Sequence, residues 1–89
     1  MEIEEGIIYK KLEKIFAKNS NPNGMVDSGT LTEGELKINL DKFSTGEQFF
    51  KVYNLKSGYY VRSSPIIDIL PIENGYQIST ENSIYRITQ

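Results

Sequence analysis

The feature that most constrains the fold is the last third of the chain, residues 58–89. Short runs of Ile, Val and Tyr alternate there with Ser, Thr, Asp and Arg. Two turn-forming pairs, Asn74-Gly75 and Glu81-Asn82, separate these runs. Alternation with a period of two, interrupted by such pairs, is typical of antiparallel strands joined by tight hairpins. This third of the chain therefore predicts a β-rich fold.

The middle of the chain carries the same pattern. Between Glu35 and Phe43, three aliphatic residues alternate with polar ones, which places Leu36, Ile38 and Leu40 on one face of a strand. Residues 25–32 contain Gly29 and are expected to form a weak strand or an ordered loop. The predicted strands are 35–43, 49–55, 59–62, 66–72, 76–80 and 83–88.

Residues 7–19 have the spacing of an amphipathic helix. Ile8, Leu12 and Ile15 follow one another at i, i+4 and i+7, and lysines occupy the remaining faces. Glutamates precede this segment, where they suit the positive end of a helix dipole. The run 19–24 is rich in Asn and contains Pro and Gly, so it ends the helix. We expect a helix at 7–19.

These elements together predict an α+β fold. The 89 residues suffice for a single domain, 1–89, in which a helix at about 7–19 precedes a β-rich part at about 25–89. Five to six short antiparallel strands in a flat sheet would leave open edges. We therefore expect the sheet to curl into a small SH3-like or OB-like barrel, with the helix covering one end or one face.

The chain has no His and no Cys, which removes the usual general base, the strongest nucleophile and thiolate metal ligands. The acids Asp41, Asp68, Glu73 and Glu81 fall on separate predicted elements, so no catalytic carboxylate pair is evident. No phosphate-binding glycine loop is present. We predict that the protein is not an enzyme and holds no metal or cofactor.

Charge and hydropathy bear on location and partners. The net charge of −2, from 12 acidic and 10 basic side chains, gives no overall attraction to nucleic acid or anionic membranes. No apolar run approaches the ~20 residues of a membrane-spanning helix, and the N-terminal residues lack the order of a secretory signal. We expect a cytoplasmic protein that does not bind membranes; its oligomeric state stays open.

Tyrosines are the most informative side chains for function. Exposed tyrosines are favoured in protein interfaces, and beside Lys or Arg they can also stack single-stranded bases. Packing of the rings in the core, with hydroxyls at the rim, is the alternative for each of them. The lysines of segment 7–19 could contact a phosphate backbone or an acidic protein partner, but the solvated face of an amphipathic helix explains them better. The candidate partner-binding residues are Tyr53, Tyr59, Tyr60, Arg62, Tyr76, Tyr85 and Arg86.

One part of the chain resembles known proteins. It consists of Arg62 to Ile66, then Ile69, then the run 78–87 (ISTENSIYRI). These residues are similar to the C-terminal hairpin of small uncharacterised β-barrel proteins of phages and other mobile elements. The resemblance covers about 26 residues. It implies a small β-rich fold and a phage setting, in which the cytoplasm would be that of the host cell, and it implies no catalytic residues. Independently of it, Thr80 and Asn82 flank a reversal and suit hydrogen bonds to turn backbone; we interpret them as fold determinants.

Two functional hypotheses follow. The first is a small non-enzymatic binding protein of the phage type, an inhibitor or modulator that docks on a host or defence protein. The second is a barrel that binds single-stranded nucleic acid or a small nucleotide. The second hypothesis makes a geometric prediction, because it requires Tyr and Arg or Lys to converge on one face of the molecule.

Overall fold

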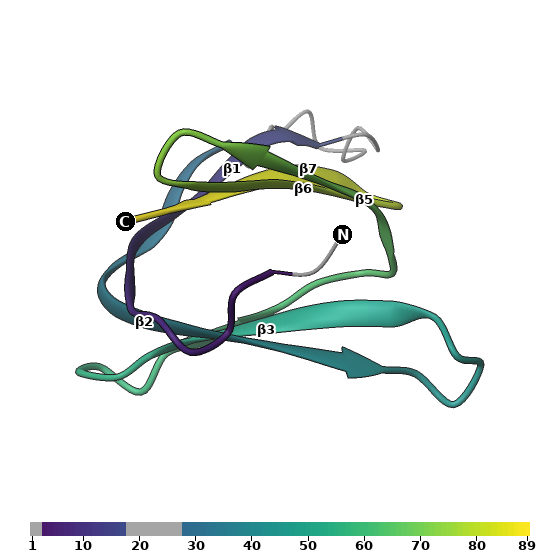
Figure 1. Ribbon diagram of the computed structural model, residues 1–89, viewed down its shortest axis with the longest axis horizontal. Helices are drawn as coiled ribbons and strands as arrows, with labels where there is room; N and C mark the ends of the chain where they lie inside the picture. The colour runs from purple at the N-terminus through teal and green to yellow at the C-terminus, as the bar shows by residue number, and fades with distance from the viewer. Residues whose placement is uncertain (1–2, 18–27) are drawn as a thin grey trace, which may run out of the picture.

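The protein is an open, seven-stranded antiparallel sheet. The computed structural model describes residues 3–17 and 28–89, and this part contains no helix. The strand order is β4-β3-β2-β1-β7-β6-β5, which makes β1 the central strand (Figure 1). The strands are β1 (Tyr9–Ala17), β2 (Gly29–Lys42), β3 (Gln48–Asn54), β4 (Tyr60–Arg62), β5 (Ile66–Ile72), β6 (Gly75–Thr80) and β7 (Ser83–Thr88).

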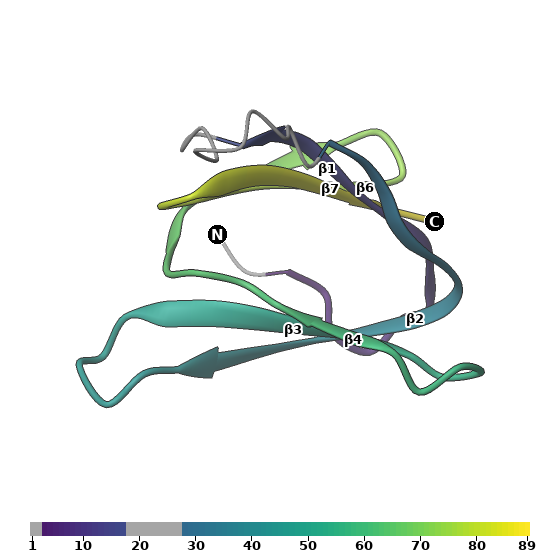
Figure 2. The ribbon, with the colours of Figure 1, turned by 180° about the vertical axis from the view of Figure 1, so that it is seen from behind.

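The sheet bends into two layers, with β1, β5, β6 and β7 above β2, β3 and β4 (Figures 1 and 2). Strand β2 joins the layers because it is 14 residues long. Its first part, Gly29 to Leu36, pairs with β1, and its second part, from Leu36 onward, pairs with β3. The edge strands β4 and β5 are not paired with each other. The prediction of five to six strands in an SH3-like or OB-like barrel is therefore wrong, because the sheet has seven strands and bends without closing.

The predicted helix at 7–19 is wrong, and with it the α+β class. Residues 9–17 form β1, which pairs with β2 on one side and β7 on the other, while residues 18 and 19 lie outside the described part. Register shifts follow Tyr9, Leu12 and Lys14, so the strand does not alternate regularly. At the first two shifts the extra residue lies on β2, and at the third it is Ile15 of β1. Tyr9 and Leu12, three apart as in a helix, are both fully buried, whereas Phe16 is 54% exposed.

The strands predicted from residue 35 onward are confirmed, with ends shifted by about one residue except at β2, which begins at Gly29 and so includes the described end of segment 25–32. The two hairpins at the C-terminal end are confirmed as well: β5 and β6 meet at Glu73-Asn74, and β6 and β7 at Glu81-Asn82. Asn74 has a φ of 65°, a conformation that Asn tolerates better than most residues. Gly75 has no substitute, because a Cβ there would overlap the carbonyl oxygen of Ile87.

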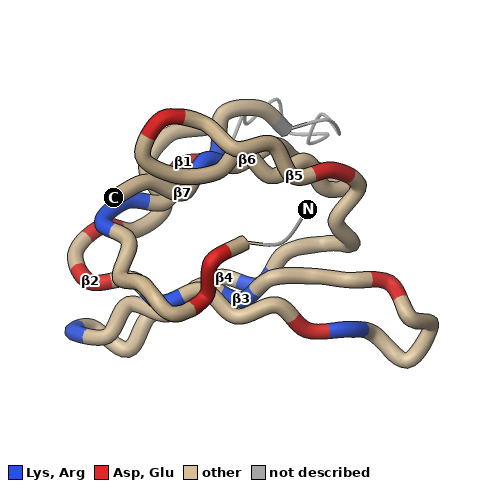
Figure 3. Tube along the Cα trace, in the orientation of Figure 1, with Lys and Arg blue, Asp and Glu red and all other residues tan. Residues whose placement is uncertain are grey.

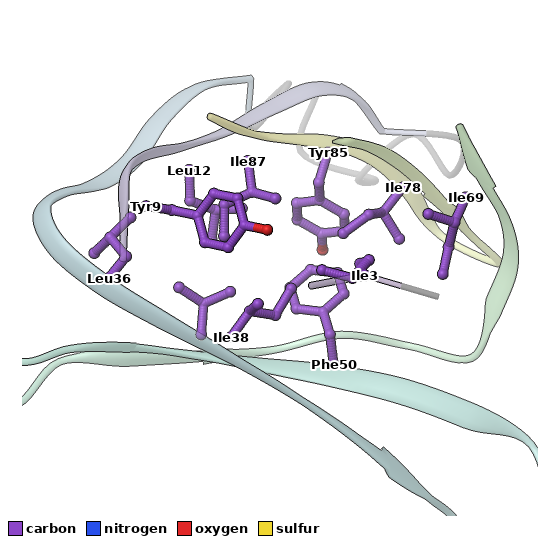
Figure 4. Close-up of a cluster of buried hydrophobic side chains, with 11 residues drawn as sticks. Ile3, Tyr9, Leu12, Leu36, Ile38, Phe50, Ile69, Ile78, Tyr85 and Ile87 are labelled. Atoms are coloured by element: carbon purple, nitrogen blue, oxygen red, sulfur yellow. The ribbon is translucent and has the colours of Figure 1, made fainter. Parts of the chain in front are cut away.

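The hydrophobic core lies between the two layers (Figure 4). Phe50 of β3 packs edge-to-face on Tyr85 of β7, with ring centroids 5.1 Å apart. Ile3, from the segment before β1, is 4% exposed and lies between the layers. The other buried members of the cluster come from six strands: Tyr9, Leu12, Leu36, Ile38, Val52, Ile69, Ile78 and Ile87.

The N-terminal segment is tied to both β1 and β2. The hydroxyl of Tyr9 donates a hydrogen bond to the carbonyl oxygen of Glu4 at 2.9 Å. The backbone N–H of Leu40, in the part of β2 that extends beyond β1, donates to the Glu5 carboxylate at 2.7 Å. A side chain thus satisfies a donor on a strand edge that has no strand partner.

One polar network joins Ser63, Ser64, Thr80 and Ser83, which lie in the part of the chain that resembles the phage proteins. The Phe50 N–H donates to Ser63 Oγ at 2.9 Å, which fixes the start of the β4–β5 connection to β3. Ser64 Oγ donates to Thr80 Oγ1 at 2.9 Å, and the Ser83 N–H donates to the same oxygen at 3.1 Å. Thr80 Oγ1 donates in turn to the Ser83 carbonyl at 3.0 Å. The role of Thr80 in holding its turn is confirmed.

Candidate binding face on strands β2 to β4

The lower layer has one face in the core and one toward solvent. Side chains alternate between the faces along each strand, and Ile38, Phe50 and Val52 occupy the core side. The opposite side carries a set of outward residues that we call the aromatic–basic face. Its members are Lys37, Asn39 and Asp41 of β2, Phe49, Lys51 and Tyr53 of β3, and Tyr60 and Arg62 of β4.

The register of the three strands orders this face into rows. Lys37 pairs with Tyr53, and Tyr53 pairs with Tyr60, which gives one row across the layer. Asn39 pairs with Lys51, and Lys51 pairs with Arg62, which gives the next. Two residues along a strand span about 6.6–6.8 Å. An aromatic row and a cationic row therefore lie side by side.

Tyr53 and Tyr60 form the aromatic part of the face. Their ring centroids are 5.9 Å apart and their planes meet at 33°. Tyr60 is 58% exposed and Tyr53 is half-buried. Cross-strand aromatic neighbours stabilise a sheet by up to about 1 kcal/mol, which explains their contact. The exposed area that remains on Tyr60 offers a flat surface to a partner.

Arg62 is positioned by two phenylalanines. Its guanidinium carbon lies 4.6 Å from the ring centroid of Phe49 and 5.2 Å from that of Phe43, and these two rings are themselves 4.4 Å apart. Phe49 is only 4% exposed, yet it does not belong to the core cluster. Arg62 and Phe43 therefore cover Phe49 from the solvent side. Stacking on aromatic rings orders the guanidinium while Arg62 itself stays exposed.

The face is positive although the chain is acidic. It has three cations, Lys37, Lys51 and Arg62, against one carboxylate, Asp41, and so carries about +2. The whole chain carries −2, which leaves −4 for the rest. Within residues 3–17 and 28–89 none of the three cations forms an ion pair; Glu35, at the rim, pairs with Lys56 at 3.6 Å. Basic residues lie along β3 and β4, whereas the N-terminal segment is acidic (Figure 3).

No protein-family model, curated protein or solved structure matches the chain. The phage setting implied by the C-terminal hairpin therefore stays a prediction. The described residues contain no helix that could span a membrane and no group of three or more acidic side chains that could hold a metal ion.

Three of the seven candidate residues, Tyr53, Tyr60 and Arg62, share the aromatic–basic face. Tyr85 does not, because it is 6% exposed and packs on Phe50 in the core, with the Lys14 ammonium 5.7 Å from its ring centroid. A buried ring cannot contact a partner. Core packing, the alternative left open for each tyrosine, applies to Tyr85.

The remaining candidates lie at three other places. Tyr76 of β6 packs edge-to-face on Tyr9, with centroids 6.5 Å apart. Arg86 lies exposed on β7 in the upper layer, where its Nε donates to Gln77 Oε1 at 3.2 Å. Tyr59 is 53% exposed but precedes β4, and it has no ring partner among the described residues. The candidates do not form a single site.

Phe43 and Phe49 were not among the candidate residues predicted from the sequence. The pair Phe49-Phe50 contained a signal, because consecutive residues of a strand face opposite sides and only one of them can be in the core. The stacking of Phe43 and Arg62 on Phe49 had no such signal, since it depends on the register between three strands and on the turn that follows β2.

A pocket of about 250 Å³ lies away from this face, between the N-terminal segment and the β5–β6 hairpin. Tyr9 and Tyr76 line it together with Glu4 and Pro71. Burial, together with the smaller effects of Tyr76 and Glu4, raises the pKa of Tyr9 to about 12. The Tyr9 hydroxyl is already committed to the Glu4 carbonyl, so this pocket offers no evident reactive group.

Proposed function

We propose that this protein is a small non-enzymatic binding protein that holds single-stranded nucleic acid on its aromatic–basic face. One observation carries the proposal: the row that contains Tyr53 and Tyr60 lies beside the row that contains Lys51 and Arg62. Bases stack on exposed aromatic rings, and lysines and arginines bind the phosphates. This convergence of Tyr with Arg and Lys is the geometric requirement of nucleic-acid binding.

The shape of the face favours a single strand over a duplex. Stacking on a tyrosine requires an unpaired base whose flat face is free, and duplex bases do not offer one. Duplex recognition in the major groove commonly uses an inserted helix or a two-stranded ribbon. The face is instead the side of a three-stranded layer, and residues 3–17 and 28–89 include no helix.

Titration of the full chain with fluorescently labelled single strands tests the proposal. Oligothymidine and a mixed sequence are compared with a duplex of the same length by anisotropy at 50 and 200 mM NaCl. We expect saturable binding of the single strands that weakens with salt, because phosphate contacts release counterions. The absence of saturable binding at low salt, or equal binding at both salt concentrations, would overturn the proposal.

A second candidate function is an inhibitor or modulator that docks on a host or defence protein. The observation that favours it is the edge strand β5, where Ile67 is 62% and Leu70 is 49% exposed. An open strand edge with exposed aliphatic side chains is a site at which another chain can dock. Asp68 and Pro71 on the same strand oppose indiscriminate pairing.

The second candidate has its own experiment. The tagged protein is used to capture partners from a host-cell lysate treated with nuclease, in parallel with the variant Ile67→Ser/Leu70→Ser. A stoichiometric protein that is captured by the native chain but not by the variant supports protein docking at β5. Recovery of the same proteins by both chains, or of none, counts against it.

A further inference from the structure

The aromatic–basic face has a spacing that defines what it can hold. We infer that it binds one two-nucleotide step with its bases unstacked, one base on Tyr60 and the next on Tyr53, and with the phosphate between them held by Arg62. This inference rests on the proposed binding of single-stranded nucleic acid. It adds the number of nucleotides, their conformation and the residue that positions the phosphate.

The ring spacing sets the conformation of the bases. Successive bases of a helical strand are about 3.4 Å apart, whereas the ring centroids of Tyr53 and Tyr60 are 5.9 Å apart and tilted by 33°. Two bases that each stack on one ring must therefore separate from each other. Nucleic-acid strands whose bases stack weakly lose less stacking free energy when their bases separate on binding. We therefore expect a preference for pyrimidine runs over adenine runs.

The position of Arg62 indicates that this residue holds the phosphate. Arg62 lies two residues from Tyr60 on β4 and opposite Lys51 on β3, so the backbone positions of both cations lie beside the aromatic row. The Arg62 guanidinium leans over Phe49, on the side away from the tyrosines. Phe49 and Phe43 fix the plane of the guanidinium. The donors of a guanidinium lie at its edge and stay available when its face is stacked. An ordered Arg also loses less side-chain entropy on binding than a free one.

Charge limits the length of the site. Lys37 ends the aromatic row on the β2 side, and a second phosphate can contact it there. Asp41 lies on the far side of the cationic row, opposite Phe49, whose ring the Arg62 guanidinium covers, so the phosphate that Arg62 holds must lie on the side of the guanidinium that faces the tyrosines. The three cations thus set the limits of a short site. With up to three phosphate contacts, the slope of log K against log [salt] is expected at about −2, since each contact contributes about 0.7 on a single strand.

The test compares two arginines of equal charge on different layers. Arg62→Gln and Arg86→Gln each remove one positive charge from an exposed side chain, but only the first lies on the face. Binding of labelled oligothymidines of one to six nucleotides and of oligoadenosine is measured by anisotropy over a salt series. Thermal unfolding of each variant verifies that it is folded.

We expect affinity to rise sharply from one to two nucleotides and only gradually beyond, and oligothymidine to bind at least several-fold more tightly than oligoadenosine. Arg62→Gln is expected to weaken binding about tenfold and to reduce the salt slope by about 0.7, while Arg86→Gln changes neither. Arg62→Lys keeps the positive charge and most of the salt slope but lacks the planar guanidinium that stacks on the phenylalanines, so its affinity falls several-fold. Tyr60→Ala is expected to cost about 5- to 150-fold, and Tyr59→Ala nothing.

The outcomes separate the inference from the proposed function. If oligonucleotides bind but Arg62→Gln and Arg86→Gln behave alike, or if Tyr60→Ala binds as the native chain does, the inference is wrong while nucleic-acid binding stands. If no oligonucleotide binds, both are wrong. If an acidic peptide rich in aromatic residues displaces the oligonucleotide at equal concentration, the face holds acidic protein segments instead, and the two-nucleotide site is rejected.

Discussion

Arg62 shields the ring of Phe49 from solvent. Its guanidinium carbon lies 4.6 Å from the ring centroid, and Phe49 is 4% exposed although it points away from the core. A cation over an aromatic ring contributes about 0.5–2 kcal/mol, depending on how far the pair is desolvated. A side chain of the candidate binding face therefore also supports the stability of the sheet.

The first prediction concerns this pair. Arg62→Ala is expected to lower the free energy of unfolding by about 1–2 kcal/mol, because it exposes Phe49 and removes the cation–π contact. Arg86→Ala, on the other layer, is expected to change it by no more than about 0.5 kcal/mol. Urea unfolding followed by circular dichroism measures both. Equal effects of the two substitutions would show that the stack contributes nothing to stability.

The second prediction concerns the β5–β6 hairpin. Gly75→Ala places a methyl group on the carbonyl oxygen of Ile87, and backbone atoms cannot move aside cheaply. We expect a loss of about 3 kcal/mol in the free energy of unfolding. The control is Gly6→Ala, because among the described residues, its two chain neighbours aside, no atom lies within 4 Å of a Cβ at that position. A loss below 1 kcal/mol for Gly75→Ala would mean that the hairpin and β7 can separate locally.

The third prediction concerns pH. The pKa of Tyr9 rises from 10.0 to about 12 on folding, mainly through burial, so the fold favours the neutral ring. This contribution to stability is fully present below pH 10 and is lost as the pH rises toward 12. It amounts to about 2–3 kcal/mol. Tyr9→Phe should cost about 1 kcal/mol at pH 7, because the hydrogen bond to Glu4 is lost.

The measurement for Tyr9 is urea unfolding of both chains between pH 7 and pH 12. The native chain should lose stability more steeply than Tyr9→Phe above pH 10, so the two curves should approach or cross. Parallel curves over the whole range would show that ionisation of Tyr9 is not linked to unfolding.

The fourth prediction concerns the buried network at the β6–β7 turn. Thr80→Val keeps the shape of the side chain but removes the oxygen that accepts from Ser64 and Ser83. Leaving buried donors without an acceptor costs about 1–3 kcal/mol. Thr30→Val, at an exposed position of β2, is expected to be neutral. The difference between the two variants in thermal unfolding checks the prediction, and a neutral Thr80→Val would contradict it.

Most of the sheet could be predicted from the sequence because regular alternation and turn pairs coincide from residue 35 onward. Segment 9–17 could not, because its irregular pairing leaves the buried residues Tyr9 and Leu12 at the three-residue spacing of a helix, and because pairing on both sides overrides local propensity. The alternation could place Tyr53 and Tyr60 on one face once their strands were paired. It could not separate exposed Tyr60 from buried Tyr85, since that depends on which side each layer turns to the core.

The central position of β1 has a consequence for how the chain folds. Lys11 pairs with Thr88, so the seam that joins the two halves of the sheet brings together segments from opposite ends of the described chain. Contacts between such distant segments form late, because loop closure must precede any gain from pairing. During synthesis, β1 and β2 therefore wait for β7 before the layers can enclose their core. We expect one cooperative folding step in milliseconds to seconds, and a nascent chain whose central strand stays unpaired on one side until its last strand emerges.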